Sequence, residues 1–199
     1  MRHRLLPVVF LVLAVTAAEA RASQTIVFLR HGEKPSSGNG QITCQGFNRA
    51  LALPDVLIGR YGKPQYLYAP NPGVRVSDPA GSFNYIRPLA TIEPLAVKLG
   101  SMPVNTKYGY TNITSLQSSL ITPTKDNTTS FVVWEHAYLV KIVQNIMNSY
   151  GGGVTVPAWI SGDYDHLYVV RVDYVGSAIN ASFDRDVEGL NGQPTTCPF

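Results

Sequence analysis

Short apolar runs and longer amphipathic stretches alternate along this chain. Three runs have the length and composition of strands: 25–29, 65–69 and 129–134. The continuous apolar run at 25–29 is typical of a strand that is buried on both faces. Apolar residues recur at helical spacing in four other stretches: 43–57, 85–99, 113–121 and 138–150. Strands that alternate with helices in this way predict an α/β fold with a mostly parallel central sheet.

The remaining segments are shorter or more polar. Residues 103–106 are predicted to form a short strand, and 166–174 alternates in polarity as a terminal edge strand does. Thr43 is placed to cap the helix that follows it, and Pro54 is expected to kink or divide that helix. Residues 73–84 form a polar, glycine-containing insert without a recognisable motif.

The first 22 residues have the pattern of a secretory signal peptide. Two arginines, at positions 2 and 4, precede an apolar stretch over 5–17 and small residues at Ala20 and Ala22. We expect cleavage after Ala22; cleavage after Ala20 and an uncleaved membrane anchor are the alternatives. Residues 23–199 are then expected to form a single domain, exported to the periplasm or secreted, without stable insertion in a membrane.

Much of the positive charge of the chain belongs to this leader. The whole sequence has a formal net charge of +3, of which the leader supplies three arginines and one glutamate, so residues 23–199 carry +1. No basic stripe or polybasic tail is left, which makes nucleic acid a poor partner. Asn112, Asn127 and Asn180 begin sequons that matter only in a source that glycosylates exported proteins. The sequence leaves the oligomeric state open.

The cysteines indicate a structural role rather than metal binding. Cys44 and Cys197 both lie in the exported part, where an oxidising compartment favours a disulfide between them; two free thiols are the alternative. Asp163, Asp165 and His166 could be taken for a metal cluster, but turn chemistry before a strand explains them better. We therefore predict no metal site and no cofactor.

Two histidines directly follow apolar strands. His31 belongs to the string Arg30-His31-Gly32 at the end of the first strand, and His136 stands two residues after the run 129–134. Because the carboxyl ends of parallel strands lie at one edge of a sheet, we expect both histidines in the ligand crevice there. A buried structural histidine is the alternative for each of them.

Arg87 adds a second cation at the start of a predicted helix. Helix starts favour anions, and a guanidinium offers paired donors that match phosphate oxygens. Arg87 and Thr91 form an Arg-x-x-x-Thr pattern. Three other features accompany this pattern: Arg30-His31-Gly32, His136 and the Thr-Cys-Gln-Gly helix opening at 43–46. Together they make the chain resemble the histidine phosphatase superfamily, the phosphoglycerate mutase-like enzymes.

The resemblance implies a three-layer α/β/α sandwich and a phosphatase that needs no metal. It implies that His31 attacks the phosphorus of a small phosphorylated substrate and becomes a phosphohistidine, which water then hydrolyses. It also implies that Arg30, Arg87 and His136 hold the phosphoryl oxygens. Lys34 is a weaker candidate for substrate contact, with a solvated loop lysine as the alternative.

The proton donor is where this chain departs from the family. Ala137 stands where one branch has an aspartate, and between Glu93 and His136 the only acid other than Glu135 is Asp126, in a polar loop. Glu135 is therefore our predicted donor, although strand alternation would turn it away from His136.

Glu33 is the second choice as donor, with a loop ion pair to Lys34 as its alternative role. Two other functions compete with a phosphatase: a non-catalytic phosphate- or sugar-phosphate-binding protein on the same fold, and a phosphomutase. Binding alone does not need the nucleophile, and a mutase of this type needs a glutamate that the chain lacks.

Overall fold

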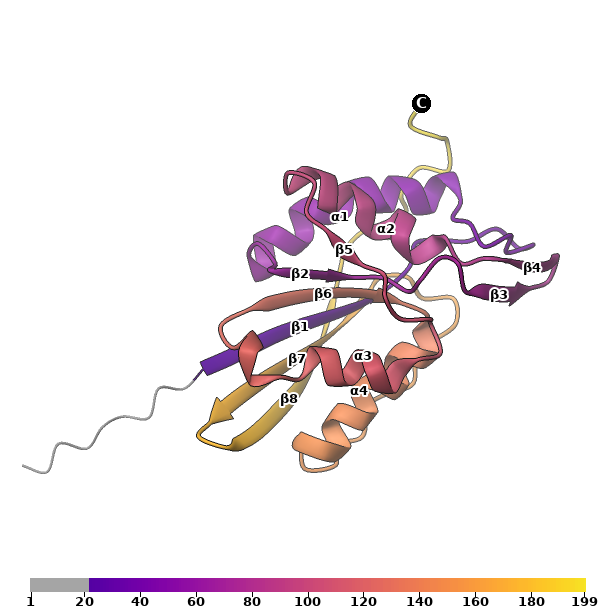
Figure 1. The fold of residues 1–199 in the computed structure, drawn as a ribbon. Helices are drawn as coiled ribbons and strands as arrows, with labels where there is room; N and C mark the ends of the chain where they lie inside the picture. The colour runs from indigo at the N-terminus through magenta and orange to yellow at the C-terminus, as the bar shows by residue number, and fades with distance from the viewer. Residues whose placement is uncertain (1–21) are drawn as a thin grey trace, which may run out of the picture.

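The computed structural model describes residues 22–199, so residues 1–21 of the predicted leader lie outside the described residues. A six-stranded sheet forms the centre of the fold (Figure 1). In spatial order its strands are β5 (Val104–Asn105), β2 (Tyr66–Tyr68), β6 (Thr129–Trp134), β1 (Ala22–Arg30), β7 (His166–Val175) and β8 (Ala178–Val187). The first four are parallel, and β7 and β8 are antiparallel to their neighbours. The prediction of a mostly parallel sheet is confirmed.

Helices cover both faces of this sheet. On one face lie α1 (Cys44–Tyr61) and α2 (Arg87–Lys98), and on the other lie α3 (Ile113–Leu120) and α4 (His136–Tyr150) (Figure 1). The side chains of β1 alternate between the two cores: Val27 and Leu29 pack with α1 and α2, whereas Ile26 and Phe28 pack with α3 and α4. This explains the continuous apolar run at 25–29 and confirms the three-layer arrangement.

The first helix begins where the sequence predicts. The Thr43 hydroxyl accepts a hydrogen bond from the Gly46 N–H at 3.1 Å, which satisfies one of the free donors at the helix start. Of the two expected effects of Pro54, a kink or a division, the division does not occur, because α1 continues unbroken to Tyr61. Pro54 is buried beside Leu53 on the face that packs against the sheet, and that burial offsets the lost backbone hydrogen bond.

Two elements differ from the sequence prediction. The insert 73–84 contains a separate antiparallel ribbon, β3 (Arg75–Asp78) and β4 (Gly81–Asn84). The strand at 166–174 is not the terminal edge strand, because β8 follows it and pairs along its length. We missed β8 because an edge strand with one solvated face carries charges, here around Asp184 and Arg185, in place of an apolar pattern.

A disulfide joins Cys44 to Cys197, as predicted, with 4.7 Å between the two Cα atoms. It fastens the C-terminal tail to the start of α1. The Asn48 side-chain amide adds hydrogen bonds of 2.8 Å to the carbonyls of Pro194 and Thr196. The tail thus lies against the helix that follows the His31 loop.

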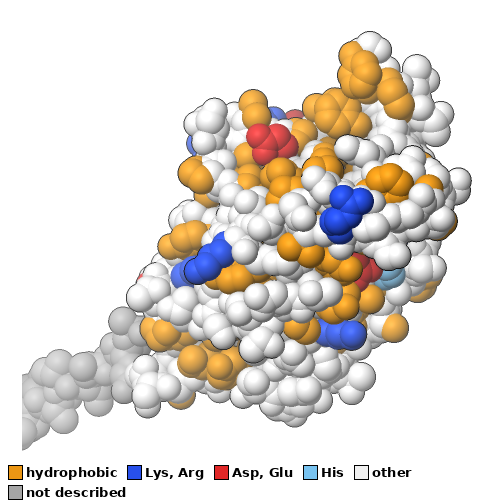
Figure 2. All heavy atoms as spheres, turned by 45° about the vertical axis from the view of Figure 1, so that its right-hand side comes forward, with side chains coloured by type: hydrophobic (Ala, Val, Ile, Leu, Met, Phe, Trp, Pro, Cys, Tyr) orange, Lys and Arg blue, Asp and Glu red, His pale blue; other side chains and the backbone are white. Residues whose placement is uncertain are grey.

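Over residues 22–199 no helix is both long and apolar enough to cross a membrane. On the face shown in Figure 2, lysine and arginine side chains stand apart from one another among polar and apolar groups.

Candidate active site

Four predicted site residues meet at the carboxyl edge of the parallel strands. β1 and β6 are adjacent, and Arg30 at the end of β1 is in register with Trp134 at the end of β6. His31 follows β1 directly, while α2 begins with Arg87 and α4 begins with His136. These residues line one cavity of about 230 Å³. The rest of its wall comes from Lys34, Val76, Ser77, Asp78, Tyr85, Tyr110 and Glu135.

His31 is held as a neutral imidazole with one nitrogen free. Its Nδ1 lies 2.8 Å from the carbonyl oxygen of Gly32. Because a carbonyl only accepts, Nδ1 carries the hydrogen and Nε2 keeps its lone pair. Burial, together with the nearby charges of Arg30 and Arg87, lowers the pKa of His31 to about 3. The imidazole is therefore unprotonated near neutral pH and suited to nucleophilic attack.

The loop that carries His31 is fixed to two helices. The Gly32 N–H donates to the hydroxyl of Thr91 at 2.9 Å, and that hydroxyl donates to the carbonyl of Arg87 at 2.8 Å. A Cβ atom on Gly32 would lie 2.7 Å from the carbonyl oxygen of Gly46, so only glycine lets the loop approach α1 this closely. These contacts explain why a threonine stands four residues after Arg87 and why position 32 is a glycine.

Arg30 is held by the segment 161–164, which no sequence motif assigns to the site. Its Nη1 donates to the backbone carbonyls of Ser161 and Asp163, and its guanidinium stacks 4.0 Å from the centre of the Tyr164 ring. The Asp163 carboxylate accepts from the Asp165 N–H at 2.8 Å, in the turn that the sequence indicated. Within residues 22–199 no cluster of three or more acidic, histidine or cysteine side chains could hold a metal ion.

Arg87 is paired with Asp78, a residue that was not among the predicted site residues. Nη1 lies 2.7 Å from Oδ2 and Nη2 lies 3.2 Å from Oδ1. The same carboxylate accepts from the Gly40 N–H at 2.9 Å and lies 3.7 Å from Lys34 Nζ. Burial raises the pKa of Asp78, but the interaction with Arg87 outweighs it, so the net pKa is below its usual range. Asp78 belongs to the insert, whose sequence contains no motif that would reveal it.

Glu135 faces the cavity beside His136. Because β6 ends at Trp134, strand alternation does not set its direction, and Glu135 instead caps α4 by accepting from the Tyr138 N–H at 2.9 Å. Its other oxygen lies 2.7 Å from His136 Nδ1. Burial raises the pKa of Glu135, yet the interactions with His136 and Tyr138 outweigh it and leave the net pKa lowered.

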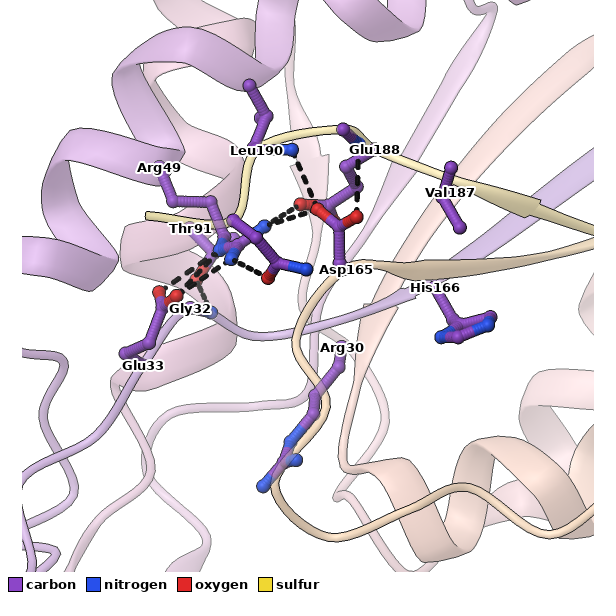
Figure 3. Close-up of polar contacts among 12 residues, drawn as sticks. Arg30, Gly32, Glu33, Arg49, Thr91, Asp165, His166, Val187, Glu188 and Leu190 are labelled. Carbon is purple, nitrogen blue, oxygen red and sulfur yellow. Dashed lines mark hydrogen bonds and ion pairs between the residues drawn. The ribbon is translucent and has the colours of Figure 1, made fainter. Parts of the chain in front are cut away.

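Glu33, the second candidate donor, does not line the cavity. Its carboxylate pairs with the guanidinium of Arg49 at 2.7 Å, so the expected alternative, an ion pair with Lys34, is wrong (Figure 3). Arg49 is fully buried and also meets Asp165 at 3.2 Å and Glu188 at 2.5 Å. In Figure 3 Arg30 points away from this cluster. Arg49 thus joins the loop after His31 to the segment that holds Arg30.

No protein-family model matches this chain, and no curated protein sequence matches it. The fold is similar to the solved structure of a candidate phosphohistidine phosphatase, SixA, from Nakamurella multipartitia, with a TM-score of 0.50 and 14% identity. That comparison covers 81% of this chain and 95% of the other. A candidate SixA from Agrobacterium tumefaciens gives a TM-score of 0.47 at 12% identity, covering 80% of this chain and 96% of that one. The first comparison confirms the α/β fold that the sequence resemblance implies.

Proposed function

We propose that this protein is a metal-independent phosphomonoester hydrolase that works through a phosphohistidine on His31. The observation that carries the proposal is the neutral imidazole of His31, fixed through Nδ1 with Nε2 free, between two buried guanidinium groups. A binding protein needs the cations but not an oriented nucleophile. The exported, single-domain character of residues 23–199 is part of this proposal, supported by the leader pattern and the disulfide.

The reaction has two steps. In the first, Nε2 of His31 forms a bond to phosphorus while the bond from phosphorus to the ester oxygen breaks, and the leaving oxygen takes a proton. In the second, water attacks the phosphohistidine, the P–N bond breaks, and inorganic phosphate leaves. Arg30, Arg87 and His136 stabilise the charge that gathers on the equatorial oxygens, and Lys34 is placed to contribute.

Glu135 is the residue that we propose as proton donor. In the free protein it is ionised, because His136 and the Tyr138 N–H hold its pKa low. A dianionic phosphoryl group in the same cavity raises the pKa of a neighbouring carboxylate, so substrate binding itself favours the protonated acid. The proton returns to Glu135 from the attacking water in the second step.

A phosphohistidine on another protein is a second candidate substrate. The observation that favours it is the low pKa of Glu135, since an imidazole leaving group that is already protonated needs no acid from the enzyme. The fold comparison with a candidate phosphohistidine phosphatase is consistent with this substrate.

The test is to trap the intermediate. The mature protein is mixed with a radiolabelled aryl phosphate, quenched, and examined for label that is stable to alkali and labile to acid. We expect such label in the wild type and none in His31→Ala, whose folded state is checked by thermal unfolding. His166→Ala is the matched histidine control, since His166 does not line the cavity, and it should keep the label. Turnover by folded His31→Ala would refute the proposal.

A further inference from the structure

Three hydrogen-bond donors in the wall of the cavity are buried without an acceptor. They are Nε of Arg30, Nε of Arg87 and the hydroxyl of Tyr85, and none of them has a hydrogen-bond partner among residues 22–199. Buried donors in proteins are nearly always paired, so three around one cavity indicate a ligand that supplies the acceptors. Two of them belong to arginines that the proposed function assigns to the phosphoryl group. The third belongs to a residue outside that assignment.

Tyr85 is packed against both the proposed nucleophile and a proposed phosphoryl ligand. Its ring lies at 84° to the His31 ring, with 6.0 Å between the centroids, and the guanidinium carbon of Arg87 lies 4.9 Å from the centre of the Tyr85 ring. The Tyr110 ring meets it from another side, with 5.2 Å between the centroids. The side chain is fully buried. These contacts hold the ring in place, and the position of the hydroxyl oxygen is therefore fixed.

The hydrogen of this hydroxyl is available to a ligand. Arg87 is the charged group with the largest effect on the pKa of Tyr85, but a guanidinium only donates hydrogen bonds and cannot take that hydrogen. The carboxylates that line the cavity are engaged elsewhere: Asp78 pairs with Arg87, and Glu135 contacts His136 and caps α4. An acceptor for the Tyr85 hydroxyl must therefore come from outside the protein.

A tyrosine also has the right charge state for this position. Burial raises the pKa of Tyr85 and outweighs the opposing effect of Arg87, so the hydroxyl keeps its hydrogen through the neutral range. A neutral donor adds a contact to an anion without adding positive charge beside His31, whose pKa the two arginines already lower. An ionised side chain at this place would instead repel a phosphoryl group.

We propose that Tyr85 is a further ligand of the phosphoryl group, and that its hydroxyl donates a hydrogen bond to a non-bridging phosphoryl oxygen beside Arg30 and Arg87. This assignment rests on the proposed function only in placing a phosphoryl group in the cavity. The group has three terminal oxygens that accept hydrogen bonds strongly, so Tyr85 does not compete with the two arginines.

A hydroxyl that is kept for a ligand affects stability differently from one that is paired within the fold. Tyr174 provides the comparison: its buried side chain donates to Gln24 Oε1 at 2.9 Å, at the start of β1 and thus at the far end of that strand from His31. Removing the Tyr174 hydroxyl breaks a hydrogen bond of the free protein. Removing the Tyr85 hydroxyl breaks none and takes away a buried group without an acceptor.

The test compares Tyr85→Phe with Tyr174→Phe in the mature protein. Calorimetry measures the binding of inorganic phosphate, and urea unfolding measures stability. Tyr85→Phe should bind phosphate roughly 10–100-fold more weakly, as expected for the loss of a hydrogen bond to a charged group, and should unfold at the same urea concentration as the wild type or a higher one. Tyr174→Phe, the matched control, should unfold at a lower urea concentration and bind phosphate as the wild type does.

Turnover gives a second measurement. Tyr85→Phe should slow alkyl and aryl phosphates by the same factor, because a contact to a non-bridging oxygen does not depend on the leaving group. A slowing confined to alkyl phosphates would overturn the assignment, since the hydroxyl would then serve the leaving oxygen.

Unchanged phosphate binding in Tyr85→Phe would also overturn it, as would a loss of stability like that of Tyr174→Phe, which would show a partner within the fold. The binding result does not depend on turnover. If Tyr85→Phe weakens phosphate binding as expected but no phosphohistidine forms in the wild type, the proposed function fails and Tyr85 remains a phosphate ligand.

Discussion

The hydroxyl of Thr91 accepts a hydrogen bond of 2.9 Å from the backbone N–H of Gly32, and so ties the helix that begins with Arg87 to the loop that carries His31. The same hydroxyl donates to the Arg87 carbonyl one turn back. The proposed nucleophile His31 and the proposed phosphoryl ligand Arg87 are thus held in one rigid unit, although they lie more than fifty residues apart in sequence.

Thr91→Val should reduce turnover more than it reduces stability. The change keeps the shape of the side chain and leaves the Gly32 N–H buried without a partner, which costs about 1–3 kcal/mol in the free energy of unfolding. Because a small displacement of a nucleophile slows the chemical step strongly, we expect kcat to fall on the order of 10–100-fold. Urea unfolding and steady-state kinetics measure the two effects. Thr91→Ser retains the hydroxyl and should recover most of kcat; equal losses in both variants would contradict this role.

Stability should fall as the pH rises from 4.5 to about 8, the interval between the unfolded and folded pKa values of Glu188. Burial, together with the charges of Asp165 and Glu33, raises the pKa of Glu188 from 4.5 to about 8 despite its contact with Arg49. A group whose pKa is raised by folding holds its proton more tightly in the folded state, so its contribution is complete below pH 4.5 and is lost as the pH passes 8. The slope from this one group is at most about 1.4 kcal/mol per pH unit.

Urea unfolding at several pH values between 5 and 9 measures this dependence. In Glu188→Gln the side chain at position 188 does not titrate, so the free energy of unfolding should change less with pH over that range. A wild-type stability that rises steadily from pH 5 to 9 would show that Glu188 is ionised throughout.

The role of Glu135 is tested through the leaving group. If Glu135 is the general acid, Glu135→Gln should slow hydrolysis of an alkyl phosphate about 10²–10⁴-fold, while an activated aryl phosphate, whose leaving group barely needs a proton, is affected far less. Glu33→Gln is the matched control, because Glu33 pairs with Arg49 and does not line the cavity. If Glu33→Gln alone shows the dependence, the two assignments must be exchanged.

The disulfide should contribute to stability without taking part in the chemistry. Replacing Cys44 and Cys197 together by serine opens a loop with a sequence separation of 153 residues and should cost about 2–5 kcal/mol in the free energy of unfolding. We expect kcat to stay within a few-fold of the wild type, because neither cysteine lines the cavity. Thiol titration of the unfolded, unreduced wild type should find no free cysteine; two reactive thiols would disprove the bond.

Local sequence was sufficient for the features that depend on neighbouring residues. The apolar run of β1 and the Thr43 cap follow from side-chain pattern and from groups within one turn. The positions of His31 and His136 could also be anticipated, because strands that run parallel in one sheet end at the same edge.

Tertiary structure decided what depends on groups far apart in the chain. The direction of the Glu33 side chain is set by its ion pair with Arg49. The position of the Arg49 side chain is set in turn by its contacts with Asp165 and Glu188, more than a hundred residues away. Asp78 comes from an insert without a motif and reaches Arg87 only because its ribbon folds against a glycine loop. The physical reason is common to both. A buried charge must find a partner wherever the fold brings one, and no local pattern records which partner that is.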